Sequence, residues 1–426
     1  MDKLHIHGPA RLRGTFLASG AKNAALPALA ATLLADEPVV LARLPRVRDI
    51  ITMTRLLGHL GVESETTPTG ALRLVATGRG RPDDAPYELV KTMRASCLVL
   101  GPLTARRGHA RVSLPGGCAI GVRPIDQHLA GLEALGAAVR LEHGYVETRA
   151  RRLRGARFRF SVPTVGGTEN LMMAAVLARG TTVLENCARE PEIIDLARLL
   201  AAMGGRLHGA GTATIEIEGV DRLGGGEHTV IADRIETGTY LIGAAMTGGE
   251  VSVEGSDPAD LAPLLEALDE IGVSVVTRVP GTSDAAPGRI QITCANGLRA
   301  RDMTTAPHPG FPTDLQAQYL ALMTQAEGTS RVREAVFENR FQHVPELVRM
   351  GARITTKGSV AHIEGRTALS GATVMATDLR ASACLVLAGL VASGTTVVDR
   401  IYHLDRGYEG MELKLQQLGA RVERVS

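Results

Sequence analysis

Tryptophan is absent from the 426-residue sequence, and aromatic residues make up only 3% of it. Few rings are therefore available for stacking on nucleic-acid bases. The net charge of +2 is also too small for nucleic-acid binding that depends on bulk electrostatics. Because no apolar run approaches the roughly 20 residues of a membrane span, the sequence predicts a protein that engages neither nucleic acid nor membrane.

Cysteine is scarce and shows no pairing pattern. The five cysteines are Cys97, Cys118, Cys187, Cys294 and Cys384, and no two of them have the CxxC spacing of a zinc site. An odd, scattered set indicates free thiols in a reducing compartment. The first eight residues are polar and charged where a signal peptide needs an apolar core, so we expect a cytoplasmic protein. Phosphate-loop and dinucleotide fingerprints are also missing.

The sequence does contain a sixfold internal repeat. Each copy, about 70 residues from the next, begins with an apolar, alanine-rich segment that predicts a buried helix. These segments are residues 20–30, 92–101, 168–175, 236–245, 313–320 and 377–387. After each one, apolar residues spaced by three and four predict an amphipathic helix that ends in glycine before a new strand. These second segments are residues 53–62, 125–139, 193–207, 261–273, 344–354 and 411–422.

The repeat predicts an α/β fold of two domains with three units each, in which sheets enclose the buried helices. A chain of this length fits two domains of about 200 residues. We expect one domain over residues 22–230 and a second over residues 1–21 and 231–426, with the active site in the cleft between them. The first strand, residues 3–6, precedes the first buried helix and is expected to join the C-terminal half.

A glycine-rich loop carries the thiol of Cys118. Pro115, Gly116, Gly117 and Gly121 exclude a regular element around it, and a helix is predicted to begin just after. A thiol beside a helix N-terminus can have a lowered pKa, and the same place can bind an anion. By itself the pattern also fits an ordinary turn with an incidental cysteine.

Basic residues recur where the predicted helices begin. They are Lys22, Arg48, Arg94, Arg123, Arg340, Arg380 and Arg406. If these ends face one cleft, guanidinium groups and helix N-termini converge on a ligand that carries phosphate and carboxylate. Any single one of them also fits a solvated surface position.

Asp314 enters the fifth buried helix from a proline-rich loop. It fits either a helix-start charge or a base that accepts a proton from a bound hydroxyl among arginines. Asp378 and Asp405 lie close to arginines in the sequence and are expected to orient them. No histidine shows metal-ligand spacing.

Seven motifs, in order along the chain, resemble those of the UDP-N-acetylglucosamine 1-carboxyvinyltransferases, a family of enolpyruvyl transferases. They are Gly20-Ala-Lys-Asn-Ala-Ala25, Leu114-Pro-Gly-Gly-Cys-Ala-Ile-Gly-Val-Arg-Pro124, Arg189-Glu-Pro-Glu192, Pro307-His-Pro-Gly-Phe-Pro-Thr-Asp314, Phe337-Glu-Asn-Arg-Phe341, Ala376-Thr-Asp-Leu-Arg-Ala-Ser382 and Asp399-Arg-Ile-Tyr-His-Leu-Asp-Arg-Gly-Tyr408.

The resemblance implies two domains of three βαβαββ units and the first committed step of peptidoglycan precursor synthesis. The family transfers the enolpyruvyl group of phosphoenolpyruvate to the 3'-hydroxyl of UDP-N-acetylglucosamine and releases phosphate. The reaction is an addition and elimination through a tetrahedral ketal, without organic cofactor or catalytic metal. The expected partners are these two small-molecule substrates.

The resemblance also implies roles for single residues. Cys118 is the general acid and the residue that fosfomycin modifies, and Asp314 contacts the sugar hydroxyl. Lys22, Asn23, Arg123 and Arg406 contact phosphoenolpyruvate, and Lys22 and Arg406 count among the catalytic residues. The positions implied around the nucleotide sugar are Asn23, Arg94, Arg123, Pro124, Ile125, Asp126, Gln127, Val162, Thr164, Val165, Gly166, Asp314, Val336, Arg340 and Arg380.

A departure and three alternatives accompany this interpretation. Val162 stands where some family members have lysine, so backbone contacts of residues 162–166 must suffice on the uridine side. A 3-phosphoshikimate 1-carboxyvinyltransferase would not need the Cys118 loop. A thiol hydrolase that uses Cys118 and His128 lacks a surrounding nucleophile motif. A non-catalytic, ligand-sensing paralogue is disfavoured by the presence of Lys22, Cys118, Asp314 and Arg406.

Overall fold

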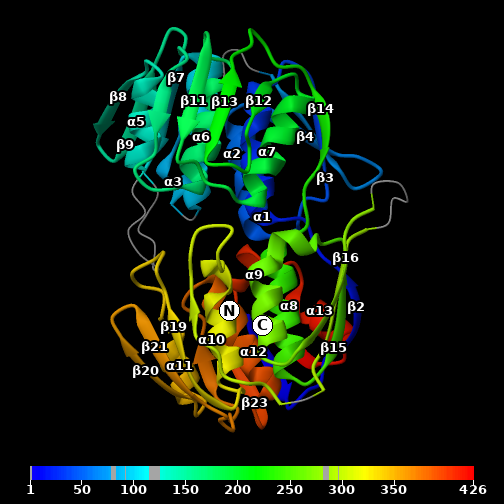
Figure 1. Cartoon of the computed structure of the whole chain (residues 1–426). Helices are drawn as coiled ribbons and strands as arrows, with labels where there is room; N and C mark the ends of the chain where they lie inside the picture. The colour runs from blue at the N-terminus through cyan, green and yellow to red at the C-terminus, as the bar shows by residue number, and fades with distance from the viewer. Residues whose placement is uncertain (1, 78–82, 92, 115–124, 282–286, 296) are drawn as a thin grey trace. The chain divides into compact units, whose positions relative to one another are not determined.

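The computed structural model describes residues 2–77, 83–91, 93–114, 125–281, 287–295 and 297–426 (Figure 1). These residues form two compact units. Unit 1 comprises the described residues of 1–19 and 232–426, and unit 2 comprises the described residues of 20–231. The chain therefore passes from one unit to the other near Ser19 and again near Ile231.

Unit 2 contains three four-stranded sheets within its described residues. In order across each sheet, the first is β14 (Gly226–Thr229), β3 (Val39–Ala42), β5 (Leu72–Ala76) and β4 (Val62–Thr66). The second is β6 (Asp84–Ala85), β7 (His109–Ser113), β9 (Tyr145–Arg149) and β8 (Ala138–Glu142). The third is β10 (Arg157–Arg159), β11 (Thr181–Glu185), β13 (Thr214–Glu218) and β12 (Arg206–His208).

Unit 1 is built in the same way over its described residues. Its first sheet is β2 (Arg13–Leu17), β15 (Glu250–Glu254), β17 (Arg289–Thr293) and β16 (Ser274–Arg278). The second is β18 (Met303–Thr304), β19 (Gly328–Arg333), β21 (Val360–Gly365) and β20 (Arg353–Lys357). The third is β22 (Thr373–Met375), β23 (Gly394–Asp399), β1 (Lys3–Gly8) and β24 (Arg421–Val425).

All six described sheets share one pairing pattern. The first edge strand runs parallel to its neighbour, and the remaining pairs are antiparallel, as in β10, β11, β13 and β12. Parallel neighbours require a crossover connection, and in four of the sheets, such as that of β10 and β11, the buried helix between the two strands provides it. The strand expected to join the C-terminal half does so, because β1 pairs with β23 and β24.

Two strands are exchanged between the units. β2 precedes the first buried helix of unit 2 but pairs with β15 of unit 1. β14 precedes the first buried helix of unit 1 but pairs with β3 of unit 2. Each sheet is thereby completed by a strand from a distant part of the chain.

The buried helices predicted from the six repeats are confirmed. They are α1 (Lys22–Ala31), η2 with α4 (Arg94–Val99, Leu100–Arg107), α6 (Val165–Ala175), α8 (Arg234–Met246), η4 with α10 (Thr313–Leu315, Gln316–Met323) and α12 (Leu379–Val391). Every residue of α10 is buried. In Figure 1, α8, α10 and α12 lie side by side between the sheets of unit 1, and they pack against one another.

The six amphipathic helices are also present. They are α2 (Arg48–His59), α5 (Asp126–Ala134), α7 (Pro191–Ala202), α9 (Ala262–Glu270), α11 (Val344–Arg349) and α13 (Met411–Gln417). In α2, the buried face carries Ile50, Met53, Leu56 and Leu57, at the helical spacing. Four short helices complete the described set: η1 (Thr32–Leu34), α3 (Tyr87–Val90), η3 (Pro258–Leu261) and η5 (Leu404–Arg406).

Each unit has its own hydrophobic core. Tyr240 and Tyr319 are fully buried in unit 1, and Leu171 and Met172 are fully buried in unit 2. Burying a side chain of this size contributes roughly 1.5–3 kcal/mol, so the apolar helices stabilise each unit from its centre. In the described parts of the chain, no helix combines the length and apolarity that a membrane crossing needs.

Candidate active site

Asp314 lies between two arginines in unit 1. Its Oδ1 atom accepts a hydrogen bond from Nη2 of Arg340 at 2.6 Å, and its Oδ2 atom accepts one from Nη2 of Arg380 at 2.9 Å. Both arginine side chains are 5% exposed, whereas the side chain of Asp314 is 26% exposed. The two arginines are therefore buried, whereas the side chain of Asp314 that they hold is partly exposed to solvent.

The arginines also determine the charge of Asp314. Burial raises the pKa of its carboxyl, but the charges and hydrogen bonds of Arg380 and Arg340 together hold that pKa well below the ordinary value of 3.8. Asp314 is thus ionised at neutral pH. Such a carboxylate is a weak base but a strong acceptor for the hydrogen bond of a substrate hydroxyl.

Arg380 is positioned by the start of α12. The carboxylate of Asp378 caps this helix by accepting hydrogen bonds from the backbone N–H groups of Arg380 and Ala381, at 2.8 and 3.1 Å. Asp378 therefore orients Arg380 through the backbone. The guanidinium group also lies beside Tyr408, with its carbon 5.5 Å from the centre of the tyrosine ring.

Arg406 lies on an element that packs against this helix. It is the last residue of η5, and η5 contacts α12. Burial and the charge of Arg406 both lower the pKa of His403. Asp405 binds Arg424 through two hydrogen bonds, of 2.6 and 3.2 Å.

Lys22 and Asn23 begin α1 in unit 2. The Nζ atom of Lys22 is 3.4 Å from Oδ2 of Asp49 on α2, and the two side chains are 11% and 6% exposed. Asp49 was not singled out from the sequence, where it fits a helix-start charge. In the structure, it holds the ammonium group of Lys22 at the start of the buried helix.

Arg94, which begins η2, lies near a buried polar cluster. Asn170 donates hydrogen bonds from Nδ2 to the carbonyl of Cys97 at 3.1 Å and to Nδ1 of His128 at 2.9 Å. Burial and the charge of Arg94 lower the pKa of His128 to about 4. His128 is therefore neutral, and since Nδ1 accepts from Asn170, its Nε2 carries the proton.

Gln127 joins two stretches that the family resemblance assigned to the nucleotide side. Its Oε1 atom accepts from the backbone N–H of Ser161 at 2.7 Å, and its Nε2 atom donates to the carbonyl of Val162 at 3.2 Å. Val162 is 59% exposed. This stretch therefore lies beside the start of α5, where Ile125 and Asp126 are found.

The adjoining residues begin α6. Thr164 caps this helix, its side chain accepting a hydrogen bond from the backbone N–H of Gly167, and Val165 and Gly166 form the first turn. A side chain at Gly166 would come within 3.4 Å of His128. Three of the expected site residues, Cys118, Arg123 and Pro124, lie outside the described residues.

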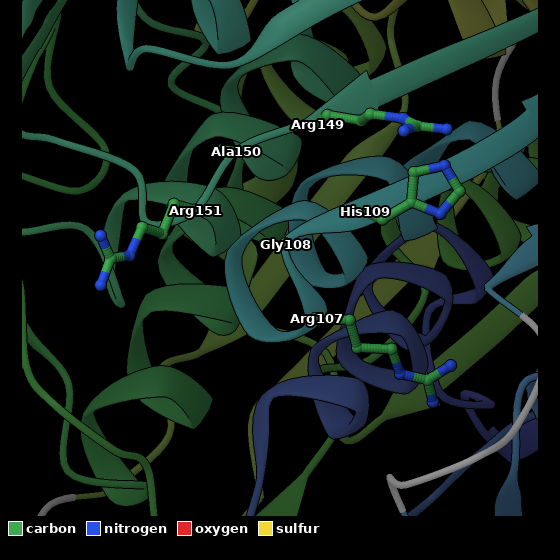
Figure 2. A pocket seen from close by; sticks show the side chains of 6 residues that line it. All are labelled: Arg107, Gly108, His109, Arg149, Ala150 and Arg151. Carbon is green, nitrogen blue, oxygen red and sulfur yellow. The ribbon is translucent and has the colours of Figure 1, made fainter.

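A cavity of about 590 Å³ elsewhere in unit 2 does not include any of these residues. It lies where the end of α4 meets the end of β9 (Figure 2). Its basic side chains point in different directions, and Arg149 and His109 both contact Glu147. They do not converge on one ligand. Among the described residues, no three His, Cys, Asp or Glu side chains are placed to hold a metal ion.

Comparison with known proteins identifies the family. A family model described as EPSP synthase (3-phosphoshikimate 1-carboxyvinyltransferase) matches residues 6–415. The chain belongs to the EPSP synthase family. Two relatives are both named UDP-N-acetylglucosamine 1-carboxyvinyltransferase. The protein from Sorangium cellulosum is 57% identical, with 100% of this chain and 99% of the relative covered, and the one from Koribacter versatilis is 54% identical, with 100% and 97% covered.

Solved structures of other proteins have the same fold. The enolpyruvyl transferase NikO from Streptomyces tendae has a TM-score of 0.87 and 27% identity, covering 100% of this chain and 99% of that one. An EPSP synthase from Acinetobacter baumannii has a TM-score of 0.77 at 18% identity, with both chains fully covered, and supports the fold alone. The predicted two-domain enolpyruvyl-transferase fold is confirmed.

Proposed function

We propose that this member of the EPSP synthase family transfers the enolpyruvyl group of phosphoenolpyruvate to the 3'-hydroxyl of UDP-N-acetylglucosamine and releases phosphate. The observation that carries the proposal is the full-length identity of 57% and 54% to two enzymes named for this transfer. The transfer supplies a peptidoglycan precursor. We place the reaction in the cytoplasm, as the scattered free thiols led us to expect.

Asp314 is the residue that binds the acceptor hydroxyl of the sugar in this proposal. The carboxylate reaches solvent while its two arginines are buried behind it, so a hydroxyl group can approach it from one side. Because its pKa is held low, Asp314 orients the hydroxyl in the ground state and takes the proton only as the new C–O bond forms and the oxygen becomes acidic. Arg340 and Arg380 keep the carboxylate in place through their hydrogen bonds to its two oxygens.

The cations that bind phosphoenolpyruvate in this proposal are Lys22, Arg123 and Arg406. Asn23 donates a hydrogen bond to it. Phosphoenolpyruvate carries a phosphate and a carboxylate, and guanidinium groups bind both in a bidentate manner. Asp49 orients Lys22, because its Oδ2 atom lies 3.4 Å from the Nζ atom of the lysine. We propose that the cations of both units act on the same pair of substrates.

The reaction proceeds by addition and then elimination. In the addition, Cys118 donates a proton to C3 of phosphoenolpyruvate while the sugar oxygen bonds to C2 and loses its proton to Asp314, which gives the tetrahedral ketal. In the elimination, C3 loses a proton and the bond from C2 to the phosphate oxygen breaks. Phosphate leaves with the electron pair, and the cations stabilise its charge.

The nucleotide part of the sugar substrate binds, in this proposal, to the two segments that the hydrogen bonds of Gln127 connect. Arg94 provides one guanidinium group, and the stretches from Pro124 to Gln127 and from Val162 to Gly166 provide backbone groups. Val162 brings no charge, and its carbonyl is bound by Gln127. The nucleotide therefore meets mostly backbone in this stretch.

Phosphate release from phosphoenolpyruvate tests the proposal. With the purified protein, release is expected when UDP-N-acetylglucosamine is present and not when shikimate 3-phosphate replaces it. Cys118→Ala is expected to lose nearly all turnover. Release with shikimate 3-phosphate alone would favour the alternative activity, and no release with either acceptor would favour a non-catalytic, ligand-sensing protein.

A further inference from the structure

Behind Asp314 lies another carboxylate, that of Glu334, which directly follows β19 and is buried, with 2% of the residue exposed. It accepts four hydrogen bonds. Its Oε1 atom accepts from Oγ1 of Thr305 at 2.9 Å and from the backbone N–H groups of Val336 and Phe337 at 2.8 and 3.1 Å. Its Oε2 atom accepts from Oγ1 of Thr313 at 2.8 Å. Two hydroxyls and two backbone groups thus stabilise the charge that burial would otherwise make costly.

The hydroxyl of Thr313 links this carboxylate to the candidate site. Nη1 of Arg340 lies 2.6 Å from the same oxygen. A guanidinium group can only donate, so the hydroxyl accepts from Arg340 and must use its single proton on Glu334. The chain of hydrogen bonds therefore has one direction, from Arg340 through Thr313 to Glu334.

The guanidinium group of Arg340 is consequently held by hydrogen bonds to two consecutive residues. Nη1 donates to Thr313 and Nη2 donates to Asp314, each at 2.6 Å. The ring of Phe337 lies 5.2 Å from its guanidinium carbon, and the backbone of Phe337 is itself held by Glu334. Glu334 thus constrains Arg340 through the hydroxyl and through the aromatic ring beside it.

We infer that Glu334 is a positioning residue for the acceptor substrate. Through Thr313 it sets the orientation of Arg340 and thereby of Asp314, and it also fixes the backbone of Val336. The inference rests on the proposed function, in which Asp314 and Val336 face the nucleotide sugar. Glu334 itself does not touch the substrate, because it is buried behind these residues. Its loss should therefore weaken recognition of the acceptor much more than recognition of phosphoenolpyruvate.

The test compares Glu334→Gln, Thr313→Val and Thr313→Ser with the wild-type protein. Glu334→Gln replaces one accepting oxygen with an amide donor, so the four hydrogen bonds cannot all be kept. Thr313→Val removes the hydroxyl while keeping its shape. Both variants are expected to raise KM for UDP-N-acetylglucosamine about tenfold or more, since each leaves a buried polar group unpaired. KM for phosphoenolpyruvate is expected to change less than about twofold. Thr313→Ser keeps the hydroxyl and should behave like the wild type.

Glu327→Gln is the matched control. Glu327 is exposed and directly precedes β19, at the opposite end of the strand from Glu334, so its substitution should change neither KM. If Glu334→Gln does not fold, the pair Thr313→Val and Thr313→Ser decides, because they differ in the hydroxyl. Wild-type turnover with an unchanged KM for the acceptor in Thr313→Val would overturn the inference alone. Absence of wild-type turnover would overturn the proposed function and the inference with it.

Discussion

Asp314 contributes to stability as well as to the proposed chemistry. Its carboxylate pairs with both Arg340 and Arg380, whose side chains are 5% exposed. Removing one member of a buried charge cluster leaves the others uncompensated, which costs more than the cluster itself contributes. The candidate site is therefore a place where function and folding depend on the same atoms.

Asp314→Asn is expected to lower the free energy of unfolding by about 3 kcal/mol at pH 7. The pKa of Asp314 is lower in the folded protein than in the unfolded chain, so the carboxylate stabilises the fold fully above the unfolded value. That contribution is lost as the pH falls toward the folded value, and the difference between variant and wild type should shrink there. Urea unfolding at several pH values measures this difference.

Asp302→Asn is the control for this prediction. Asp302 pairs with Arg331 at 2.7 Å, but the two side chains are 51% and 66% exposed, so solvent screens the pair. The effect at pH 7 should be much smaller than that of Asp314→Asn. Equal effects of the two substitutions would contradict the assignment of Asp314 to a buried charge cluster.

The remaining cysteines indicate which thiol reacts. Cys97, Cys187, Cys294 and Cys384 are all buried. Burial raises the pKa of Cys97 to about 11 and that of Cys187 to about 12, and it raises those of Cys294 and Cys384 as well. Since the thiolate is the nucleophile, these four thiols should be unreactive in the folded protein.

Alkylation at about pH 8, where an ordinary thiol begins to ionise, and treatment with fosfomycin are therefore both expected to modify Cys118 alone. Mass spectrometry of peptides from the treated protein identifies the site. Urea-unfolded protein serves as the control, in which an alkylating agent should reach all five cysteines. Modification of any of the four buried thiols in the folded protein, at a rate comparable with Cys118, would count against Cys118 as the reactive thiol.

At the scale of elements, the crossing of α4 and α6 shows how the buried helices approach each other. The backbone N–H of Gly101 donates to Oδ1 of Asn170 at 2.6 Å. A Cβ atom at position 101 would lie 2.3 Å from the backbone oxygen of Asn170 and 2.4 Å from its side-chain oxygen. Gly101 therefore permits a contact that also holds the polar cluster around His128.

Gly101→Ala is expected to lower the free energy of unfolding by about 1–3 kcal/mol, because the helices must separate to admit the methyl group. Gly58→Ala is the matched control. Gly58 lies in α2, and a Cβ atom there would meet nothing within 4 Å, so the helix propensity of alanine should raise stability by up to about 1 kcal/mol. Thermal unfolding measures both. Equal effects would show that α4 and α6 do not approach as closely as described.

The helices were predictable because the sequence of each helix carries a local pattern that indicates it. An alanine-rich apolar run predicts a helix buried on all sides, and α10 and α12 follow that rule closely. The amphipathic helices follow from apolar spacing and a final glycine, as in α13 before Gly419. Their exact ends differ by a few residues, because capping and short 3₁₀ turns such as η4 decide them.

The contacts of the site were harder to predict. Asp314 is 26 residues from Arg340 and 66 residues from Arg380, and no local pattern pairs them. One pattern in the sequence does point to Glu334. Ser330 and Val332 are buried in β19, so position 334 continues the inward phase of the strand, where a carboxylate is unusual.

At the scale of the whole molecule, the exchanged strands were beyond what local patterns can show. The pairing of β14 with β3 joins residues 226–229 to residues 39–42, and β2 with β15 joins residues 13–17 to residues 250–254. Strands this far apart in the sequence pair only when the fold brings them together, because closing so long a loop costs chain entropy. The number of repeats could still be counted, because each unit carries its own buried helix.

The proposed function draws on residues from both units. Lys22, Asn23 and Arg94 belong to unit 2, whereas Asp314, Arg340, Arg380 and Arg406 belong to unit 1. Each group has its own local support, from Asp49 in unit 2 and from Glu334 and Asp378 in unit 1. The central claim is that these groups together perform enolpyruvyl transfer to a sugar nucleotide.

Turnover in D₂O tests that claim most directly. The protein is incubated with phosphoenolpyruvate and UDP-N-acetylglucosamine, and the product is examined by NMR and mass spectrometry. Addition and elimination predict an enolpyruvyl group on the 3'-oxygen of the sugar, one phosphate released for each product, and solvent deuterium in its vinyl methylene group. No enolpyruvyl product, or a product without deuterium in that group, would contradict the account.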